Sequence, residues 1–100
     1  MAVDEWEVVD IAEVREDLEG KAVEYREFLN VPTMSCGLYS LAAGSKDMQA
    51  PHDEDEVYLV LEGKARMRLG DNEREVKPGT LLYIKAATEH SFFEIEEDML

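Results

Sequence analysis

Alternating apolar and polar residues, together with short apolar runs, predict strands along most of this chain. Between residues 64 and 69, Ala65, Met67 and Leu69 alternate with Lys and Arg side chains, a period of two typical of a strand with one buried face. A turn at residues 70–73 leads into residues 74–76, which predicts a hairpin. Residues 21–29 also alternate, whereas residues 35–42, 57–61 and 81–84 are more continuously apolar runs beside turns, and we expect strands at all four and at residues 91–95.

One segment follows a helical period instead. Its apolar side chains recur on one stripe, at Ile11, Val14 and Leu18. Asp10 is suited to cap the amino end, with Glu13 three residues on as its capping-box partner, and Gly20 is a natural stop. The sequence therefore predicts one short helix over residues 10–20.

The fold class follows from this order of elements. Six or seven closely spaced strands, separated by Gly and Pro and preceded by one helix, favour an all-β antiparallel barrel or double-sheet roll over an α/β fold. One hundred residues without an internal repeat or linker predict a single domain over residues 1–100.

The charge of the chain limits the kinds of partner that it can bind. It has 24 acidic and 10 basic residues, and its formal net charge is -14. Such a field repels phosphate backbones and anionic lipids, so we expect neither nucleic acid nor membrane partners. Adaptation to high salt is a minor alternative reading of this acidic protein. Residues 1–7 contain neither a basic nor an apolar segment of the kind found in signal peptides. No window reaches the ~18 apolar residues of a membrane span, so we expect a cytoplasmic protein.

The single cysteine, Cys36, excludes an internal disulfide. It falls within the strand expected at residues 35–42. We interpret it as a small hydrophobic strand residue rather than a nucleophile, because free cysteines usually pack in this way.

The candidate chemistry lies at two strand entrances. His52 and Glu56 precede the apolar run at residues 57–61, and His90, the other of the two histidines, precedes the strand at 91–95. Two imidazoles and one carboxylate suit a divalent transition metal, and the set leaves coordination positions open. The alternative is that both histidines are ordinary half-buried residues with satisfied nitrogens.

The spacing around these residues resembles the two motifs of the cupin superfamily over about residues 35–95. The first motif is matched by Gly44, His52, Glu56 and Gly63, and the second by Gly79 and His90. The chain departs from the family at four positions. Ala50 stands in place of a His ligand, while the family's Pro, Gly and Asn are replaced by Lys85, Ala87 and Glu94.

The resemblance implies a cupin double-stranded β-helix, a jelly-roll-type barrel with one short amino-terminal helix added. It also implies a metal bound by His52, Glu56 and His90, with Fe(II), Mn, Ni and Zn not distinguished. Ala50 would leave one position to water or substrate. Glu54 is a candidate fourth ligand, although a solvated carboxylate in an acidic run is the commoner case.

The expected pocket is mainly apolar, as small-molecule sites usually are. We predict that its walls are formed by residues within the expected strands or at their ends, namely Tyr39, Met48, Tyr58, Met67, Tyr83 and Phe92. Lys85 could orient an anionic substrate at the rim, although a lone Lys is more often solvated.

Several functions remain open, because one scaffold hosts many activities. We expect a small metal-binding cupin that acts on or binds a small molecule, as a dioxygenase, isomerase or decarboxylase if it is an enzyme. The alternatives are a non-catalytic module that binds or senses a small ligand, with or without metal, and a scaffold that only forms interactions. We also expect a homodimer, because open strand edges need cover, with Trp6 and residues 23–29 at the contact.

Overall fold

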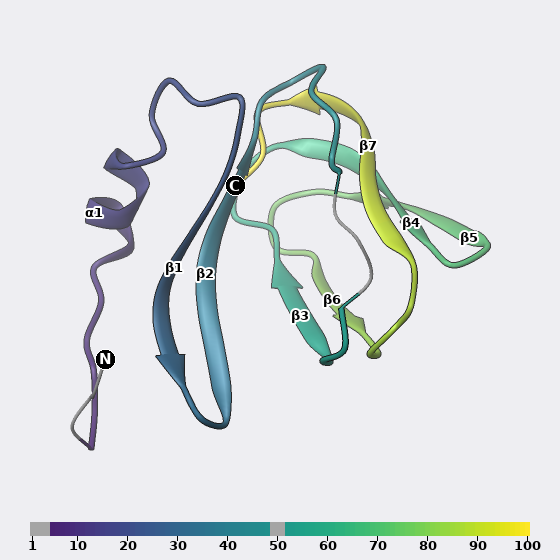
Figure 1. Cartoon of the computed structure of the whole chain (residues 1–100). Coiled ribbons are helices and arrows are strands. Elements are labelled where there is room, and N and C mark those ends of the chain that lie inside the picture. The colour runs from purple at the N-terminus through teal and green to yellow at the C-terminus, as the bar shows by residue number, and fades with distance from the viewer. Residues whose placement is uncertain (1–4, 49–51) are drawn as a thin grey trace.

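The computed structural model describes residues 5–48 and 52–100, and these ranges are mostly β (Figure 1). Within the described ranges one helix precedes seven strands, as the order of sequence patterns predicts. The elements are α1 (Ile11–Glu16), β1 (Val23–Val31), β2 (Met34–Leu41), β3 (Glu56–Leu59), β4 (Lys64–Leu69), β5 (Asn72–Val76), β6 (Leu81–Ile84) and β7 (His90–Glu97).

The strands pair antiparallel in three sheets. These sheets are β1–β2, β3–β6 and β5–β4–β7. The hairpin predicted from the alternation at 64–69 is confirmed as β4–β5, with Leu69 opposite Asn72. An isolated bridge joins Leu41, at the end of β2, to Met99. The Leu41 amide donates to the Met99 carbonyl at 3.1 Å, and the Met99 amide donates to the Leu41 carbonyl at 2.8 Å. The mostly β fold is thus confirmed, whereas the described strands do not close into one barrel, so the closed jelly roll stays a prediction.

The core lies between the β3–β6 and β5–β4–β7 sheets and follows the predicted alternation. Ala65 and Met67 are buried, and Leu69 packs against the core from a half-buried position. The buried cluster comprises Leu41, Val60, Ala65, Met67, Val76, Leu82, Ile84, Phe92, Ile95 and Met99. All but one of these residues come from Val60 onward, so the carboxyl-terminal half of the chain supplies most of the core.

The helix α1 is shorter than the sequence pattern suggests. Its amino end is capped as predicted, because Asp10 Oδ1 accepts a hydrogen bond of 3.0 Å from the Ala12 amide. After Glu16 the chain continues in turns, and Gly20 has a φ of +78°. Leu18, which completes the predicted stripe, is buried but lies in these turns. Among the described residues, no helix is long and apolar enough to cross a membrane.

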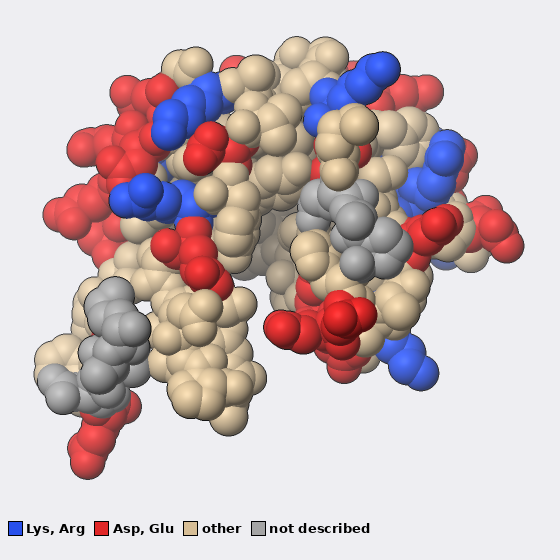
Figure 2. All heavy atoms as spheres, viewed as in Figure 1, with Lys and Arg blue, Asp and Glu red and all other residues tan. Residues whose placement is uncertain are grey.

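Acidic side chains gather on the side of the molecule that carries α1 (Figure 2). The exposed carboxylates of this segment are Asp10, Glu13, Glu16, Asp17 and Glu19. These side chains form a face exposed to solvent, as runs of like charges usually do.

Within residues 5–48 and 52–100, two residues other than glycine adopt left-handed backbone conformations. Ala87 has a φ of 65° and Glu94 a φ of 47°. These are the positions where the cupin motif has Gly and Asn, the two residue types that enter this region at low cost. The chain therefore keeps the backbone shape of the motif without the residues that favour it.

Candidate metal centre

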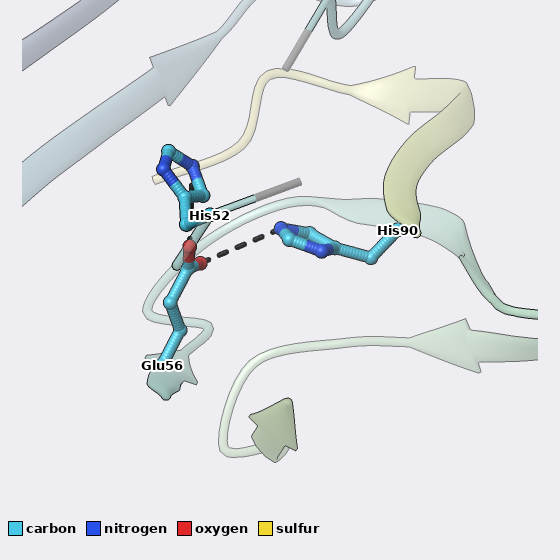
Figure 3. Close-up of side chains that lie close together, drawn as sticks. All are labelled: His52, Glu56 and His90. Carbon is cyan, nitrogen blue, oxygen red and sulfur yellow. Dashed lines mark ion pairs between the residues drawn. The ribbon is translucent and has the colours of Figure 1, made fainter. Parts of the chain in front are cut away.

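The three predicted ligands come from two strand entrances and one loop (Figure 3). Glu56 is the first residue of β3, His90 is the first residue of β7, and His52 lies in the segment that leads into β3. Figure 3 shows the His90 ring extending from β7 toward the carboxylate of Glu56. Residues far apart in the chain are thus brought to one place.

The distances among the ligand atoms fit a single ion. His52 Nε2 lies 3.1 Å from Glu56 Oε1, and His90 Nε2 lies 3.4 Å from Glu56 Oε2. The three residues offer ligand atoms that all lie within 4.8 Å of one another. Two donors that are each ~2.1 Å from an ion lie ~3.0 Å apart at a right angle and ~3.4 Å apart at a tetrahedral angle. The donor set therefore has both the chemistry and the spacing of a divalent metal site.

The orientation of His90 is fixed by its other nitrogen. His90 Nδ1 lies 2.9 Å from the carbonyl oxygen of Thr88. A carbonyl only accepts hydrogen bonds, so Nδ1 carries a hydrogen, and in the neutral ring the lone pair is then on Nε2, the nitrogen that a metal would bind. His90 is 6% exposed, whereas His52 is exposed. Such a carbonyl partner is typical of histidines that bind metals.

Tyr58 is the predicted pocket residue that contacts a ligand directly. Its hydroxyl lies 3.3 Å from His90 Nε2, and the centres of the two rings are 5.9 Å apart. On its other side the Tyr58 ring meets Phe92 edge-on, with centroids 5.4 Å apart. Tyr58 therefore joins the candidate metal site to the apolar core.

The other predicted pocket residues have different surroundings. Met67 and Phe92 belong to the core, and Met48 and Tyr83 are largely exposed. The Tyr39 hydroxyl donates a 2.8 Å hydrogen bond to Asp47, and burial, followed by this bond, raises the pKa of Tyr39 well above its usual range. The other carboxylate oxygen of Asp47 accepts from the Phe92 amide at 2.9 Å. Asp47, which the sequence patterns did not single out, thus ties the segment before the site to β2 and β7.

A second carboxylate missed in the sequence connects the loops that carry the histidines. Asp55 accepts hydrogen bonds from the Ala86 amide at 2.9 Å and from the Tyr83 hydroxyl at 3.0 Å. These two bonds, the backbone one first, hold the pKa of Asp55 below its usual value. Nearby, the Ala87 amide donates to the His52 carbonyl at 2.6 Å. The segments at residues 52–55 and 85–88 are therefore fastened together.

The remaining sequence candidates lie apart from this group. Ala50 falls outside the described residues, so its place beside the metal stays a prediction. Glu54 is exposed and does not belong to the group formed by His52, Glu56 and His90. Lys85 is also exposed.

Comparison with known proteins agrees with this architecture. The chain is 43% identical to an uncharacterized protein of Streptomyces coelicolor over 75 residues, which cover 75% of this chain and 71% of that one. It resembles a crystal structure from Thermus thermophilus with a TM-score of 0.75 and 23% identity, covering 94% of this chain and 90% of the other. A protein of unknown function from Streptococcus pyogenes has a TM-score of 0.71 and 16% identity, with 97% and 83% of the two chains covered.

The family comparison covers the same part of the chain as the two motifs. The model of the cupin domain matches residues 37–99, which include the core strands and all three candidate ligands. The structural likenesses at low identity support the same fold. The chain belongs to the cupin family.

Proposed function

We propose that this cupin binds one divalent transition metal through His52, Glu56 and His90 and presents it to a small molecule. The observation that carries the proposal is the buried His90 imidazole, whose Nε2 lies 3.4 Å from a carboxylate that also meets His52. Fe(II), Mn, Ni and Zn all accept such a donor set. When bound, the ion would supply Lewis-acid chemistry or, for iron, activation of oxygen.

The residues around the ligands have separate roles in this proposal. Glu56 offsets part of the charge of a cation, and the Thr88 carbonyl keeps His90 in the tautomer that binds metal. The Tyr58 hydroxyl beside His90 is a polar group that can orient a small molecule, and its ring provides an apolar wall. Three protein ligands leave coordination positions for that molecule. A dioxygenase, isomerase or decarboxylase would each use such positions.

A second candidate is a metal-free module that binds a small ligand without catalysis. It is favoured by one observation, namely that Glu56 lies within ion-pair distance of both imidazoles. A protonated imidazole can satisfy such a carboxylate, so an ion is not the sole means of stabilising it. Metal analysis separates the two candidates.

The test is the metal content of untagged protein after incubation with each of the four ions and removal of the excess. We expect about one ion per chain for the wild type and a large loss for the double variant His52→Ala, His90→Ala. Glu54→Gln is the matched control, because it removes one carboxylate from the same acidic segment without touching the ligand group. Equal metal content in the double variant and the wild type would refute the metal site. A wild type without bound metal would favour the second candidate.

Open coordination positions can be tested separately with Co(II) in place of the natural ion. The visible spectrum of Co(II) depends on its ligands, so azide should change the spectrum if it enters an open position. The same titration on Tyr58→Phe should need more azide if the hydroxyl helps to orient a bound molecule. A spectrum that azide leaves unchanged would argue against a metal that meets small molecules.

A further inference from the structure

Tyr58 brings a further oxygen to the candidate metal centre. Its hydroxyl oxygen Oη lies 3.3 Å from His90 Nε2, and Glu56 Oε2 lies 3.4 Å from the same nitrogen. The hydroxyl is therefore as near to the His90 ligand atom as the carboxylate is. This separation is longer than the ~2.5–3.2 Å typical of hydrogen bonds in proteins. It falls within the ~3.0–3.4 Å that separates two donors bound to one ion at angles from a right angle to a tetrahedral angle.

The strand β3 directs Tyr58 to the same side as a candidate ligand. Tyr58 comes two residues after Glu56, and the register of β3 with β6 is unbroken from Glu56 to Leu59. Side chains two apart on a regular strand point to the same face. Both are half-buried, whereas Val57 and Leu59, which alternate with them, are more than half exposed. Glu56 and Tyr58 therefore reach the inner side of the sheet together, where both meet His90 from β7.

The ring of Tyr58 is held in place by the core. It meets Phe92 edge-on, with the ring centres 5.4 Å apart and 83° between the two planes. Phe92 is 5% exposed, and its amide donates a 2.9 Å hydrogen bond to Asp47 Oδ2. The oxygen of a tyrosine lies on the axis of its ring, so a fixed ring also fixes the oxygen. The fold thus positions this donor before an ion arrives, as a well-placed ligand requires.

We propose that Tyr58 is a fourth protein ligand of the metal, bound through its phenolate oxygen. This role rests on the proposed function, because it requires the ion held by His52, Glu56 and His90. Binding breaks the O–H bond of Tyr58 and forms a metal–oxygen bond, and the proton passes to the solvent. The carboxylate and the phenolate together then match the charge of a divalent ion, which favours a partly buried site. An octahedral ion would still keep positions for a small molecule.

Iron is the ion that makes a bound tyrosine visible. Tyrosine is one of the protein ligands of iron. A phenolate bound to Fe(III) gives a charge-transfer band in visible light, whereas imidazole and carboxylate ligands do not give this band. The chain has four tyrosines, so the band can be assigned by substituting them.

The first test is the visible spectrum of untagged protein that is loaded with Fe(III) from a soluble chelate and freed of excess iron. We expect a charge-transfer band for the wild type, with phenolate vibrations in its resonance Raman spectrum, and no band for Tyr58→Phe. This variant keeps the ring that packs on Phe92, and circular dichroism checks its fold. Tyr25→Phe is the matched control, because it removes the hydroxyl of a tyrosine that is 52% exposed on β1 and should keep the band.

The iron content of the same samples distinguishes failure of the Tyr58 ligand from failure of the metal site. A wild type that holds about one iron per chain without the band would overturn the role of Tyr58 and leave the proposed function intact. A band that persists in Tyr58→Phe would overturn the same role. A wild type that binds none of Fe, Mn, Ni and Zn would overturn both.

The second test uses the Co(II) protein and needs no iron. If Tyr58 is a ligand, Tyr58→Phe should change the Co(II) spectrum before any azide is added. It should also lower metal affinity by more than the about 10-fold typical of residues that only orient ligands. Because a coordination position opens, the variant should need less azide than the wild type. A hydroxyl that only orients azide would leave the azide-free spectrum unchanged and raise the azide needed, and this result would overturn the proposal.

Discussion

The segment from residue 56 to residue 100 and the segment from residue 5 to residue 41 use apolar residues in different ways. The later segment buries Met67, Val76 and Phe92 between its sheets and contributes nearly all of the core. The earlier segment is also rich in apolar residues, yet Val23 and Tyr25 on β1 remain exposed. Apolar content alone therefore does not decide burial, because a strand needs a second layer to pack against.

Few contacts attach the earlier segment to the later one. They include the bridge between Leu41 and Met99 and the ion pair of Arg15 on α1 with Glu62 in the turn before β4. Stability is consequently uneven along the chain, and local opening should begin at the hairpin and helix rather than in the core.

The largest difference between the two segments should appear on truncating a methionine in each. Met67→Ala removes a fully buried side chain from the core and should lower the free energy of unfolding by about 2–5 kcal/mol. Met34→Ala, at a side chain that is 55% exposed on β2, should cost no more than about 0.5 kcal/mol in dilute, monomeric protein. Urea denaturation followed by circular dichroism measures both values. Similar losses of unfolding free energy for the two variants would contradict an uneven distribution of stability along the chain.

Relieving the backbone strain in the later segment should instead raise the free energy of unfolding. Ala87→Gly should raise stability by about 1 kcal/mol, because glycine removes the cost of a left-handed residue at a φ of 65°. For a chain of this length that corresponds to about 4–8 °C in melting temperature. Ala86→Gly is the matched control, since its backbone is not among the left-handed residues and the added flexibility should lower the melting temperature. A fall in melting temperature for Ala87→Gly would show that the conformation carries no strain.

The fastening between the two loops of the metal centre can be weakened without touching a ligand. Asp55→Ala removes the acceptor for the Ala86 amide and the Tyr83 hydroxyl, so His52 and His90 should be held less firmly. We expect metal affinity to fall by about 10-fold, as is typical of residues that orient ligands. Asp53→Ala is the control, because it removes the same charge from the same acidic run. Equal losses of affinity in a metal titration would mean that charge, not positioning, is responsible.

The smallest effect concerns the ion pair between the segments. The guanidinium of Arg15 holds the pKa of Glu62 below its usual value of 4.5. A depressed carboxylate pKa stabilises the folded state at pH values above 4.5, and this contribution is lost as the pH falls through the lower folded value. Glu62→Gln should therefore reduce the melting temperature slightly at pH 7 and have no effect below the folded pKa. An effect that is the same at pH 7 and at pH 2.5 would exclude the charge as its cause.

The sequence predicted strands well where alternation and turns agree. Residues 64–69 and 81–84 were predicted with the bounds of β4 and β6. The first segment alternates apolar and charged residues up to a turn at Gly70, and the second is a short apolar run that follows a turn at Gly79. The strand expected at 57–61 stops at Leu59, since the amides of Val60 and Leu61 bond instead to the carbonyls of Thr80 and Leu100. Such distant partners leave no trace in the local pattern of the chain.

The candidate site shows the same limit. His52, Glu56 and His90 could be proposed from the spacing of the two motifs, and they do lie together. Asp55 could not be distinguished from Asp53, because neighbouring carboxylates in one acidic run differ only in what the fold brings to them. The contact of Tyr58 with His90 likewise depends on how β3 and β7 meet.

The fastening made by Asp55 has a consequence for the relation between metal and fold. Neither of its two partners, the Ala86 amide and the Tyr83 hydroxyl, belongs to the candidate metal ligands. The loops around the site are therefore held together by groups that an ion would not touch. Zinc fingers are the opposite case, because their ligands hold the chain together and they unfold under chelation. In this cupin, shape and ligand set are separable. A substitution at a ligand position could therefore change the metal site while the frame persists, which would let this architecture change its choice of metal without first losing its fold.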